Sequence, residues 1–168
     1  MTDAQRDEWL ARCMAEHKTS LMRMAYLYLG DDELAEDAVQ ETFIKAYRSL
    51  DRFRGESNEN TWLMRIAINT CKSMRRTAWM RVFRNGPPLE AVPEPGREDH
   101  YRDDTVLRAV MELPDRLRQV VLLYYYQDMK AAEVAQALGI SESTVGTRLM
   151  RARNKLAISL RGWYFEEE

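Results

Sequence analysis

The sequence has few cysteines and histidines and no long apolar run. Its 168 residues include two cysteines, Cys13 and Cys71, and two histidines, His17 and His100. These residues lack the spacing of a zinc site, so the sequence predicts no metal or other cofactor, and each histidine is expected at the surface. The longest apolar run, residues 120–126, is far too short to cross a bilayer, and the polar N-terminus lacks the apolar core of a signal peptide.

These absences exclude several classes of protein. Free thiols without a leader sequence favour a reducing cytoplasm and no insertion into a membrane. A redox switch between Cys13 and Cys71 stays conceivable. The chain also has no nucleophile motif, no phosphate-binding loop and no paired acids of a pocket motif, so an enzyme is not expected.

The formal net charge of −2 hides an uneven distribution. Residues 1–50 carry 6 basic and 10 acidic groups, a net charge of −4, whereas residues 51–76 carry 6 and 3, a net charge of +3. A second basic patch lies in residues 141–161, which hold five basic residues and one acid. The local charge therefore suggests a nucleic acid as a partner, although the overall charge does not.

Residues 113–156 contain the spacing of a helix-turn-helix. Ala135, Gly139 and Val145 stand four and then six residues apart. In this motif a small residue lets two helices approach, a glycine takes the left-handed turn, and a branched apolar residue anchors the second helix. Ser141 is placed to cap that helix, whose outer face is basic, as in a helix that enters the major groove of DNA. A plain helical hairpin with a solvated charged face is the alternative.

The N-terminal residues predict helices with one acidic surface. Residues 3–29 are expected to form one or two helices, and Gly30 and Asp31 supply a stop signal and an N-cap for the next. In residues 31–50, apolar side chains recur with the helical period and predict a buried face. The opposite face consists of Asp37, Gln40, Glu41, Ile44 and Arg48. This face would suit a basic partner, although the pattern alone slightly favours an ordinary solvated surface.

A polar loop and a basic helix come next. Gly55 and the polar residues around it are expected to end the preceding helix. Asn60 or Thr61 is expected to cap a helix that starts near Trp62. One face of this helix carries three cations and an amide, namely Arg65, Asn69, Lys72 and Arg76. Such a face, next to a polar loop and an aromatic residue, fits single-stranded or unstacked nucleic acid, although many solvated helices share the pattern.

Residues 80–103 have the composition of a flexible linker. The residues that forbid regular structure there are Gly86, Pro87, Pro88, Pro93, Pro95 and Gly96. As a coil, the segment would hold its ends roughly 25–30 Å apart. The sequence therefore predicts an all-α fold with two small helical domains, residues 1–79 and 104–168, that could contact one duplex more than a helical turn apart. Pro114 is expected to divide the helices of residues 104–127.

The whole chain resembles the extracytoplasmic-function sigma factors, the compact two-domain class of the bacterial sigma family. DAVQETFIKAYRSLDRFRG (37–55) resembles their second conserved region and TWLMRIAINTCKSMRR (61–76) their promoter-melting segment. LPDRLRQVVLLYYYQDMKAAEVAQALGISESTVGTRLMRARNKL (113–156) resembles their fourth region. The resemblance covers about residues 17–77 and 105–160. It implies a transcription initiation factor whose partners are core RNA polymerase, promoter DNA and an anti-sigma factor.

The resemblance also implies a role for each surface. The helix of residues 31–50 would bind polymerase, chiefly the clamp helices of subunit β′ with the β subunit nearby, through Asp37, Gln40, Glu41, Ile44 and Arg48. The next loop and helix would bind the −10 element, with one base unstacked into a pocket, through Phe53, Ser57, Asn58, Arg65, Asn69, Lys72 and Arg76. The second helix of the helix-turn-helix would read the −35 element through Ser143, Thr144, Thr147, Arg148, Met150, Arg151 and Lys155. Trp62 is expected to buttress the −10 loop.

Two positions depart from the family pattern. Gly146 stands where many relatives have a basic residue, which removes a contact to DNA and costs about 1 kcal/mol of helix propensity. Glu59 and Asn60 stand where an aromatic–basic pair is common, and a carboxylate facing the DNA there would oppose phosphate.

A free-standing helix-turn-helix regulator is the alternative function. With about four cations engaged, the logarithm of its affinity would fall against the logarithm of salt concentration with a slope of only about −3.6, which implies weak binding without a partner. The sequence also offers no obvious dimerisation helix. Binding to core polymerase would favour the sigma factor, and an unaided dimer on a palindrome would favour the alternative.

Overall fold

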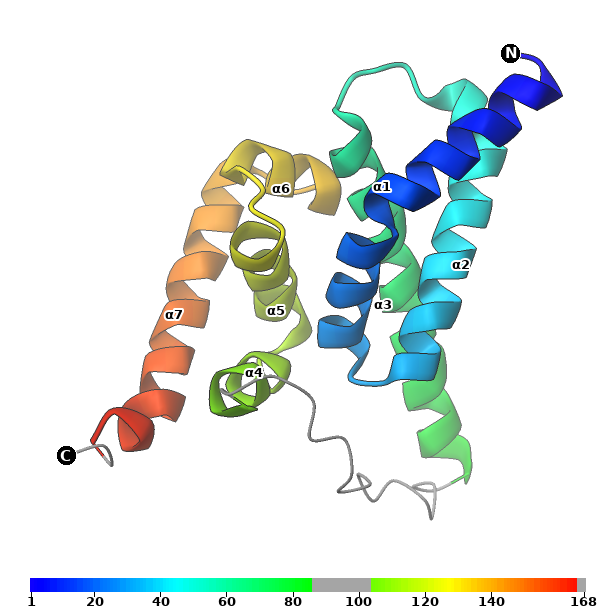
Figure 1. Cartoon of the computed structure of the whole chain (residues 1–168). Helices are drawn as coiled ribbons and strands as arrows, with labels where there is room; N and C mark the ends of the chain where they lie inside the picture. Colours follow the sequence, from blue (N-terminus) through cyan, green and yellow to red (C-terminus); the bar gives the residue numbers. More distant parts are fainter. Residues whose placement is uncertain (86–103, 166–168) are drawn as a thin grey trace.

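The structure, a computed structural model, describes the backbone of residues 1–85 and 104–165 and the side chains of residues 1–77 and 105–161. In these ranges every regular element is a helix, which confirms the predicted all-α class. The helices of the N-terminal half lie together on one side of the molecule and those of the C-terminal half on the other (Figure 1).

Three long helices form the N-terminal half: α1 (Asp3–Leu29), α2 (Asp32–Ser49) and α3 (Glu59–Asn85). The stop and start signals between the first two act as predicted. Gly30 adopts a left-handed φ of +71°, and the Asp31 carboxylate accepts the backbone N–H of Leu34 at 2.9 Å. Residues 3–29 therefore form one helix, and the apolar face of α2 is buried against its neighbours as its periodicity predicts.

The start of α3 differs from the prediction. The helix begins at Glu59 because the side chain of Asn58 accepts the backbone N–H of Thr61 at 2.7 Å, which is the geometry of an N-cap. Neither Asn60 nor Thr61 is the cap, and Trp62 already lies in the first turn. The connection from α2 contains a short 3₁₀ turn, η1 (Leu50–Arg52), followed by Gly55 with a φ of +73°.

The C-terminal half consists of α4 (Asp104–Met111), α5 (Asp115–Val121), a π-helical turn η2 (Leu122–Tyr126), α6 (Ala131–Leu138) and α7 (Glu142–Phe165). Pro114 separates α4 from α5 as expected. Gly139 ends α6 with a φ of +66°, and Ser141 Oγ accepts the backbone N–H of Thr144 at 3.1 Å at the start of α7. Val145 is fully buried, so the helix-turn-helix forms as its spacing predicts.

The two halves pack against each other through one continuous core. Tyr28 of α1 is fully buried, and its hydroxyl accepts a hydrogen bond from Gln119 Nε2 of α5 at 3.1 Å. Arg118 of α5 donates to the Tyr28 carbonyl oxygen at 2.7 Å. An ion pair of 2.7 Å joins Arg75 of α3 to Asp115 of α5. Sequence reasoning gave no sign of this interface, because the residues that meet across it are about 40–107 positions apart.

The first boundary of the predicted linker needs correction. Residues 80–85 are helical, as part of α3, whereas the linker was expected to start at residue 80. The physical reason is local, since the first helix-breaking residues of this segment are Gly86, Pro87 and Pro88. The rest of the expected linker, residues 86–103, lies outside the described residues.

Candidate polymerase and promoter interfaces

The expected polymerase-binding residues lie together on the outer side of α2. Asp37, Gln40, Ile44 and Arg48 are exposed, and Glu41 is half-buried. Ile44 is a large apolar side chain that keeps 44% of its surface accessible.

A groove runs along this surface between α1 and α2. Its volume is about 400 Å³, and mostly apolar side chains line it. Gln40, Ile44 and Arg48 form part of its wall on α2, and Leu10 and Met14 face them from α1. The acidic face of α2 therefore borders a preformed apolar groove, which the sequence pattern alone did not predict.

The loop before α3 forms a second hollow, of about 500 Å³. Phe53, Ser57 and Arg65, all expected to contact the −10 element, line it together with Trp62. The Trp62 ring stacks on Phe53 at a centroid distance of 4.7 Å and meets Trp9 of α1 edge-on at 6.0 Å. Trp62 therefore packs against the loop through Phe53, the contact that a buttressing role would need.

The remaining −10 candidates lie along α3 and at its cap. Arg65, Asn69, Lys72 and Arg76 are all exposed on this helix. Asn58 is also exposed, but its amide is engaged, because its oxygen caps α3 and its nitrogen lies 3.4 Å from a carboxylate oxygen of Glu133 on α6.

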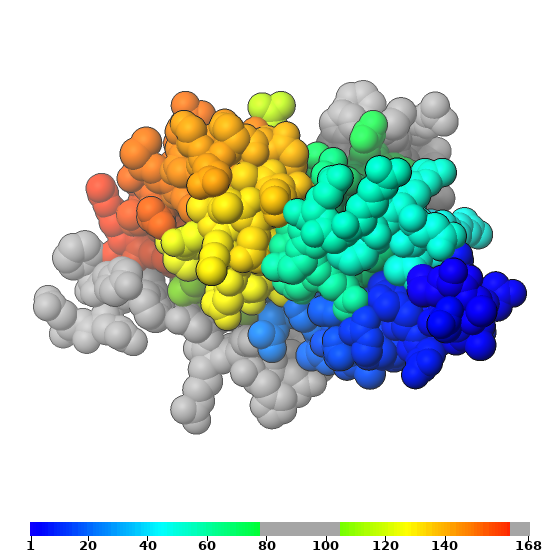
Figure 2. All heavy atoms as spheres, turned by 90° about the horizontal axis from the view of Figure 1, so that it is seen from above, coloured from blue at the N-terminus to red at the C-terminus, as the bar shows by residue number. Residues whose placement is uncertain are grey.

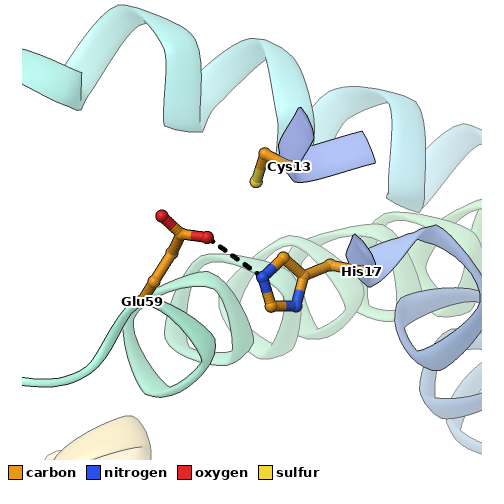
Figure 3. Close-up of side chains that lie close together, drawn as sticks. All are labelled: Cys13, His17 and Glu59. Carbon is orange, nitrogen blue, oxygen red and sulfur yellow. Dashed lines mark hydrogen bonds and ion pairs between the residues drawn. The ribbon is translucent and has the colours of Figure 1, made fainter. Parts of the chain in front are cut away.

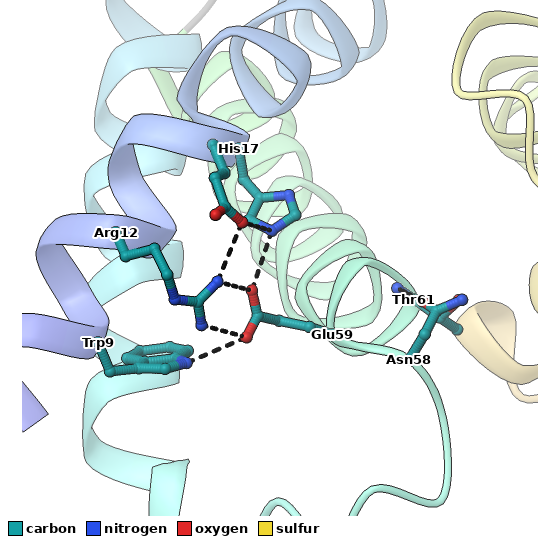
Figure 4. Close-up of polar contacts among 7 residues, drawn as sticks. Trp9, Arg12, His17, Asn58, Glu59 and Thr61 are labelled. Carbon is teal, nitrogen blue, oxygen red and sulfur yellow. Dashed lines mark hydrogen bonds and ion pairs between the residues drawn. The ribbon is translucent and has the colours of Figure 1, made fainter.

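The Glu59 side chain points towards Trp9, Arg12 and His17 of α1 (Figure 4). Its carboxylate accepts two hydrogen bonds from Arg12, at 2.8 and 3.1 Å, and one from Trp9 Nε1 at 3.1 Å. The Arg12 guanidinium is the largest cause that lowers the pKa of Glu59 to about 2. The expectation that this charge would oppose phosphate is therefore not supported, because Arg12 neutralises the carboxylate.

His17 also belongs to this network, contrary to the prediction that it is an isolated surface residue. Its side chain is only 16% exposed, and its Nε2 lies 3.1 Å from Glu59 Oε1. Cys13 lies one turn earlier on α1 and is fully buried. Helix packing brings these groups together, which spacing along the chain could not indicate. His100 lies outside the described residues.

Cys13 and Cys71 are both buried, free thiols. Burial is the first cause that raises the pKa of each thiol to about 12. A thiol of this kind is a weak nucleophile, which argues against a redox switch between the two cysteines.

The second helix of the helix-turn-helix presents most of the −35 candidates to solvent. Ser143, Thr147, Met150, Arg151 and Lys155 are exposed. Thr144 and Arg148 are half-buried. Arg153 lies on the same helix, but its Nε donates to the Tyr125 hydroxyl at 2.6 Å, so this cation is held against the C-terminal half.

Comparison with known proteins decides the family. Residues 13–81 match the family described as Sigma-70 region 2, and residues 103–156 match Sigma-70, region 4. The chain is 32% identical over 152 residues to RNA polymerase sigma factor SigV of Bacillus subtilis, covering 90% of each chain. It is 34% identical over 156 residues to the ECF RNA polymerase sigma-E factor of Escherichia coli K12, covering 84% of this chain and 80% of that one. The chain belongs to the extracytoplasmic-function RNA polymerase sigma factors.

Solved structures agree with this sigma factor fold. The sigma factor RpoE of Bartonella quintana, in complex with the anti-sigma factor NepR, aligns with a TM-score of 0.76 at 25% identity over 90% of this chain and 96% of that one. CnrH, in complex with the cytosolic domain of CnrY, aligns with a TM-score of 0.70 at 26% identity over 95% and 94%.

Family membership settles the general function. The protein is a sigma factor that directs promoter-specific transcription initiation, and the polymerase, not this chain, performs the chemistry. The free-standing regulator is not favoured. Among the helices that the structure describes, none is long and apolar enough to cross a membrane.

The packing of the halves brings the residues expected to contact the two promoter elements close together. Gln136 of α6 forms part of the wall of the loop hollow, and Figure 2 shows the loop (cyan to teal) directly beside α6 (yellow). A larger cleft of about 780 Å³ is lined by residues of α3 and of the C-terminal half. Lys72 and Arg76 of α3 line it together with Arg148 of α7, so cations assigned to two promoter elements face one cleft.

Proposed function

We propose that this sigma factor binds core RNA polymerase through the exposed face of α2 and the groove between α1 and α2. The clamp helices of subunit β′ would place an apolar side chain in the groove and basic groups against Asp37 and Glu41. The exposure of Ile44 at the rim of a preformed apolar groove carries this proposal. Apolar anchors in a pocket with charges around them are typical of energetically important contacts.

Charge reversal tests the polymerase interface. Asp37→Lys together with Glu41→Lys is expected to abolish comigration with core polymerase on a sizing column. The matched control is Glu8→Lys with Glu112→Lys, because these exposed acids lie elsewhere and the change in net charge is the same. Normal comigration of the Asp37/Glu41 variant would show that α2 is not the polymerase-binding face.

The loop and α3 would bind the −10 element. One unstacked base would enter the hollow lined by Phe53 and Ser57, and the exposed cations of α3 would hold the backbone. Asn69→Ala is expected to reduce promoter opening, measured by the fluorescence of 2-aminopurine in the −10 element, while polymerase binding is kept. Unchanged opening would remove Asn69 from the assignment.

Helix α7 would read the −35 element in the major groove. Arg151 is exposed, and no hydrogen bond or ion pair engages its guanidinium within the described residues. A good arginine contact to a base contributes about 1–3 kcal/mol of discrimination. Arg151→Ala is expected to relax −35 preference in transcription assays with mutated promoters. Arg153→Ala is the matched control, since Tyr125 already holds that guanidinium, and it should leave the preference unchanged.

Both promoter elements would be bound only after the two halves separate. Arg148 and Lys72 face the same cleft, whereas surfaces that bind two elements of one duplex need to lie more than a helical turn, ~34–36 Å, apart. The packed arrangement would then be the form of the free protein, and the parts that move would divide between the end of α3 at residue 85 and the start of α4 at residue 104.

The proposed cellular context is the cytoplasm, with an anti-sigma factor as second partner. Support comes from the resemblance to RpoE, whose structure contains an anti-sigma factor. Affinity purification of the tagged chain from its native cell is expected to yield polymerase and an inhibitor protein. Recovery of polymerase alone under every growth condition would contradict the second partner.

A further inference from the structure

Three side chains of different metal-binding types meet between α1 and α3. Cys13 and His17 are one helical turn apart on α1, and Glu59 is the first residue of α3. Cys13 Sγ, a ring nitrogen of His17 and a carboxylate oxygen of Glu59 all lie within 4.8 Å of one another. Figure 3 shows the three side chains converging from the two helices on a common space.

The surrounding residues hold the Glu59 carboxylate in this orientation. Trp9 Nε1 and Arg12 Nη2 donate to Oε2, at 3.1 and 2.8 Å. Oε1 accepts from Arg12 Nη1 and lies 3.1 Å from His17 Nε2, on the side of the cysteine. Metal-binding carboxylates are commonly held by hydrogen bonds of this kind, which orient one oxygen towards the ion.

We propose that Cys13, His17 and Glu59 form a binding site for a divalent transition-metal ion of the zinc type. Sulfur, imidazole nitrogen and carboxylate oxygen are the three donors that Zn²⁺ accepts, and three protein ligands leave a fourth position for water. With bonds of about 2.0–2.3 Å, the donors around a tetrahedral ion lie roughly 3.3–3.8 Å apart. The widest separation in the cluster would therefore need to shrink by about 1 Å, which side-chain rotation can provide.

The charges of the cluster accommodate such an ion. Arg12 carries one positive charge, and two carboxylates within 3.0 Å of it, those of Glu16 and Glu59, carry two negative charges. With the Cys13 thiol neutral, these side chains together have a net charge of −1. On binding, the S–H bond of Cys13 breaks, an S–metal bond forms, and the proton goes to solvent. The divalent cation and the thiolate together then bring the group to neutrality, so Arg12 does not exclude the ion.

The bound ion would tie α1 to the first turn of α3. That turn follows directly on Asn58, which caps α3 at the end of the proposed −10 loop. Metal binding would therefore fix the position of this loop relative to the groove between α1 and α2. The metal site itself does not depend on the proposed roles of the loop or the groove.

Cobalt(II) titration of the full chain tests the site directly. Co²⁺, used in place of Zn²⁺, is expected to give a thiolate-to-metal charge-transfer band that saturates at one ion per chain. Added Zn²⁺ should displace the Co²⁺ and remove the band. Cys13→Ser is expected to abolish the band, and His17→Ala to weaken Co²⁺ binding at least tenfold. The chain supplies matched controls, because its only other cysteine and histidine are Cys71 and His100, so Cys71→Ser and His100→Ala should bind as the wild type does.

Two results would overturn the proposal. One is the absence of a charge-transfer band after stoichiometric Co²⁺ is added to the folded wild-type chain. The cluster would then be only an ion-pair network centred on Arg12. The other is a band that persists in Cys13→Ser or disappears in Cys71→Ser. If circular dichroism shows that Cys13→Ser is unfolded, the comparison of Co²⁺ binding by His17→Ala and by His100→Ala decides instead, because the His17 side chain is partly exposed and its truncation adds no bulk to the core.

Discussion

The contact between Tyr28 and Gln119 allows a direct test of the packed arrangement. The Tyr28 side chain is fully buried, and its hydroxyl accepts a hydrogen bond from Gln119 Nε2 across the interface at 3.1 Å. A neutral hydrogen bond contributes about 0.5–1.5 kcal/mol net, and a buried polar group that loses its partner costs about 1–3 kcal/mol. Tyr28→Phe is therefore expected to lower the free energy of unfolding by about 1–2 kcal/mol, and Gln119→Leu by a similar amount.

The double variant separates this hydrogen bond from other effects. Once both polar groups are gone, neither is left unsatisfied, so the double variant should lose about 1 kcal/mol less than the sum of the single variants. The measurement is urea unfolding of the full chain, followed by circular dichroism. Tyr47→Phe is the control, because its hydroxyl bonds Asp7 within the N-terminal half and should show no coupling to Gln119.

The size of the coupling decides whether the halves are in contact in solution. A value near 1 kcal/mol would mean that Tyr28 and Gln119 meet in most molecules of the free protein. A value below about 0.3 kcal/mol, within the additivity expected of distant sites, would refute the packed arrangement and restore two independent domains.

Three further predictions concern stability. Because Arg12 lowers the pKa of Glu59 from 4.5 to about 2, Glu59→Gln should lower the free energy of unfolding by about 1–2 kcal/mol at pH 7, after allowance for solvent screening. That difference is present above pH about 4.5 and should narrow as the pH falls towards 2, so an unchanged difference in urea unfolding at pH 3 would contradict it. Gly146→Ala adds a methyl group in open space inside α7 and should raise stability by about 0.5–1 kcal/mol; a lower Tm would argue against a helix there. Gly30→Ala and Gly55→Ala should each lower the free energy of unfolding by about 1–2 kcal/mol, since both glycines have positive φ, and Met111 Cε, which would lie 2.9 Å from the new Cβ at Gly30, ends a flexible side chain that can move aside. An unchanged Tm in either variant would contradict this backbone argument.

Much of the fold was predictable because its signals are local. Gly30, Asp31 and Pro114 stop or start helices through the φ angle or a side-chain cap, and neither effect needs a distant partner. The same is true of Gly139 and Ser141 in the helix-turn-helix. The start of α3 was predicted too late because several polar residues there can cap, and only the structure distinguishes Asn58 from Asn60 or Thr61.

The candidate sites were predictable to the extent that they lie on one helix. The exposed faces of α2, α3 and α7 follow from the helical period, which places residues three and four apart on one side. The groove beside Ile44 and the hollow beside Phe53 needed the structure, because α1 supplies one wall of the first and α6 part of the second.

The sequence by itself determined the helices, the caps of α2 and α7, the helix-turn-helix and membership of the sigma family, since these rest on short-range geometry and on motifs in a fixed order. Only the tertiary structure decided which charges are neutralised and which surfaces are covered. Glu59 is paired with Arg12, 47 residues away, and Glu133 lies against Asn58, 75 residues away. Such contacts arise when amphipathic faces bury their apolar area together, and burial between helices is not specified by the spacing of residues along any one of them.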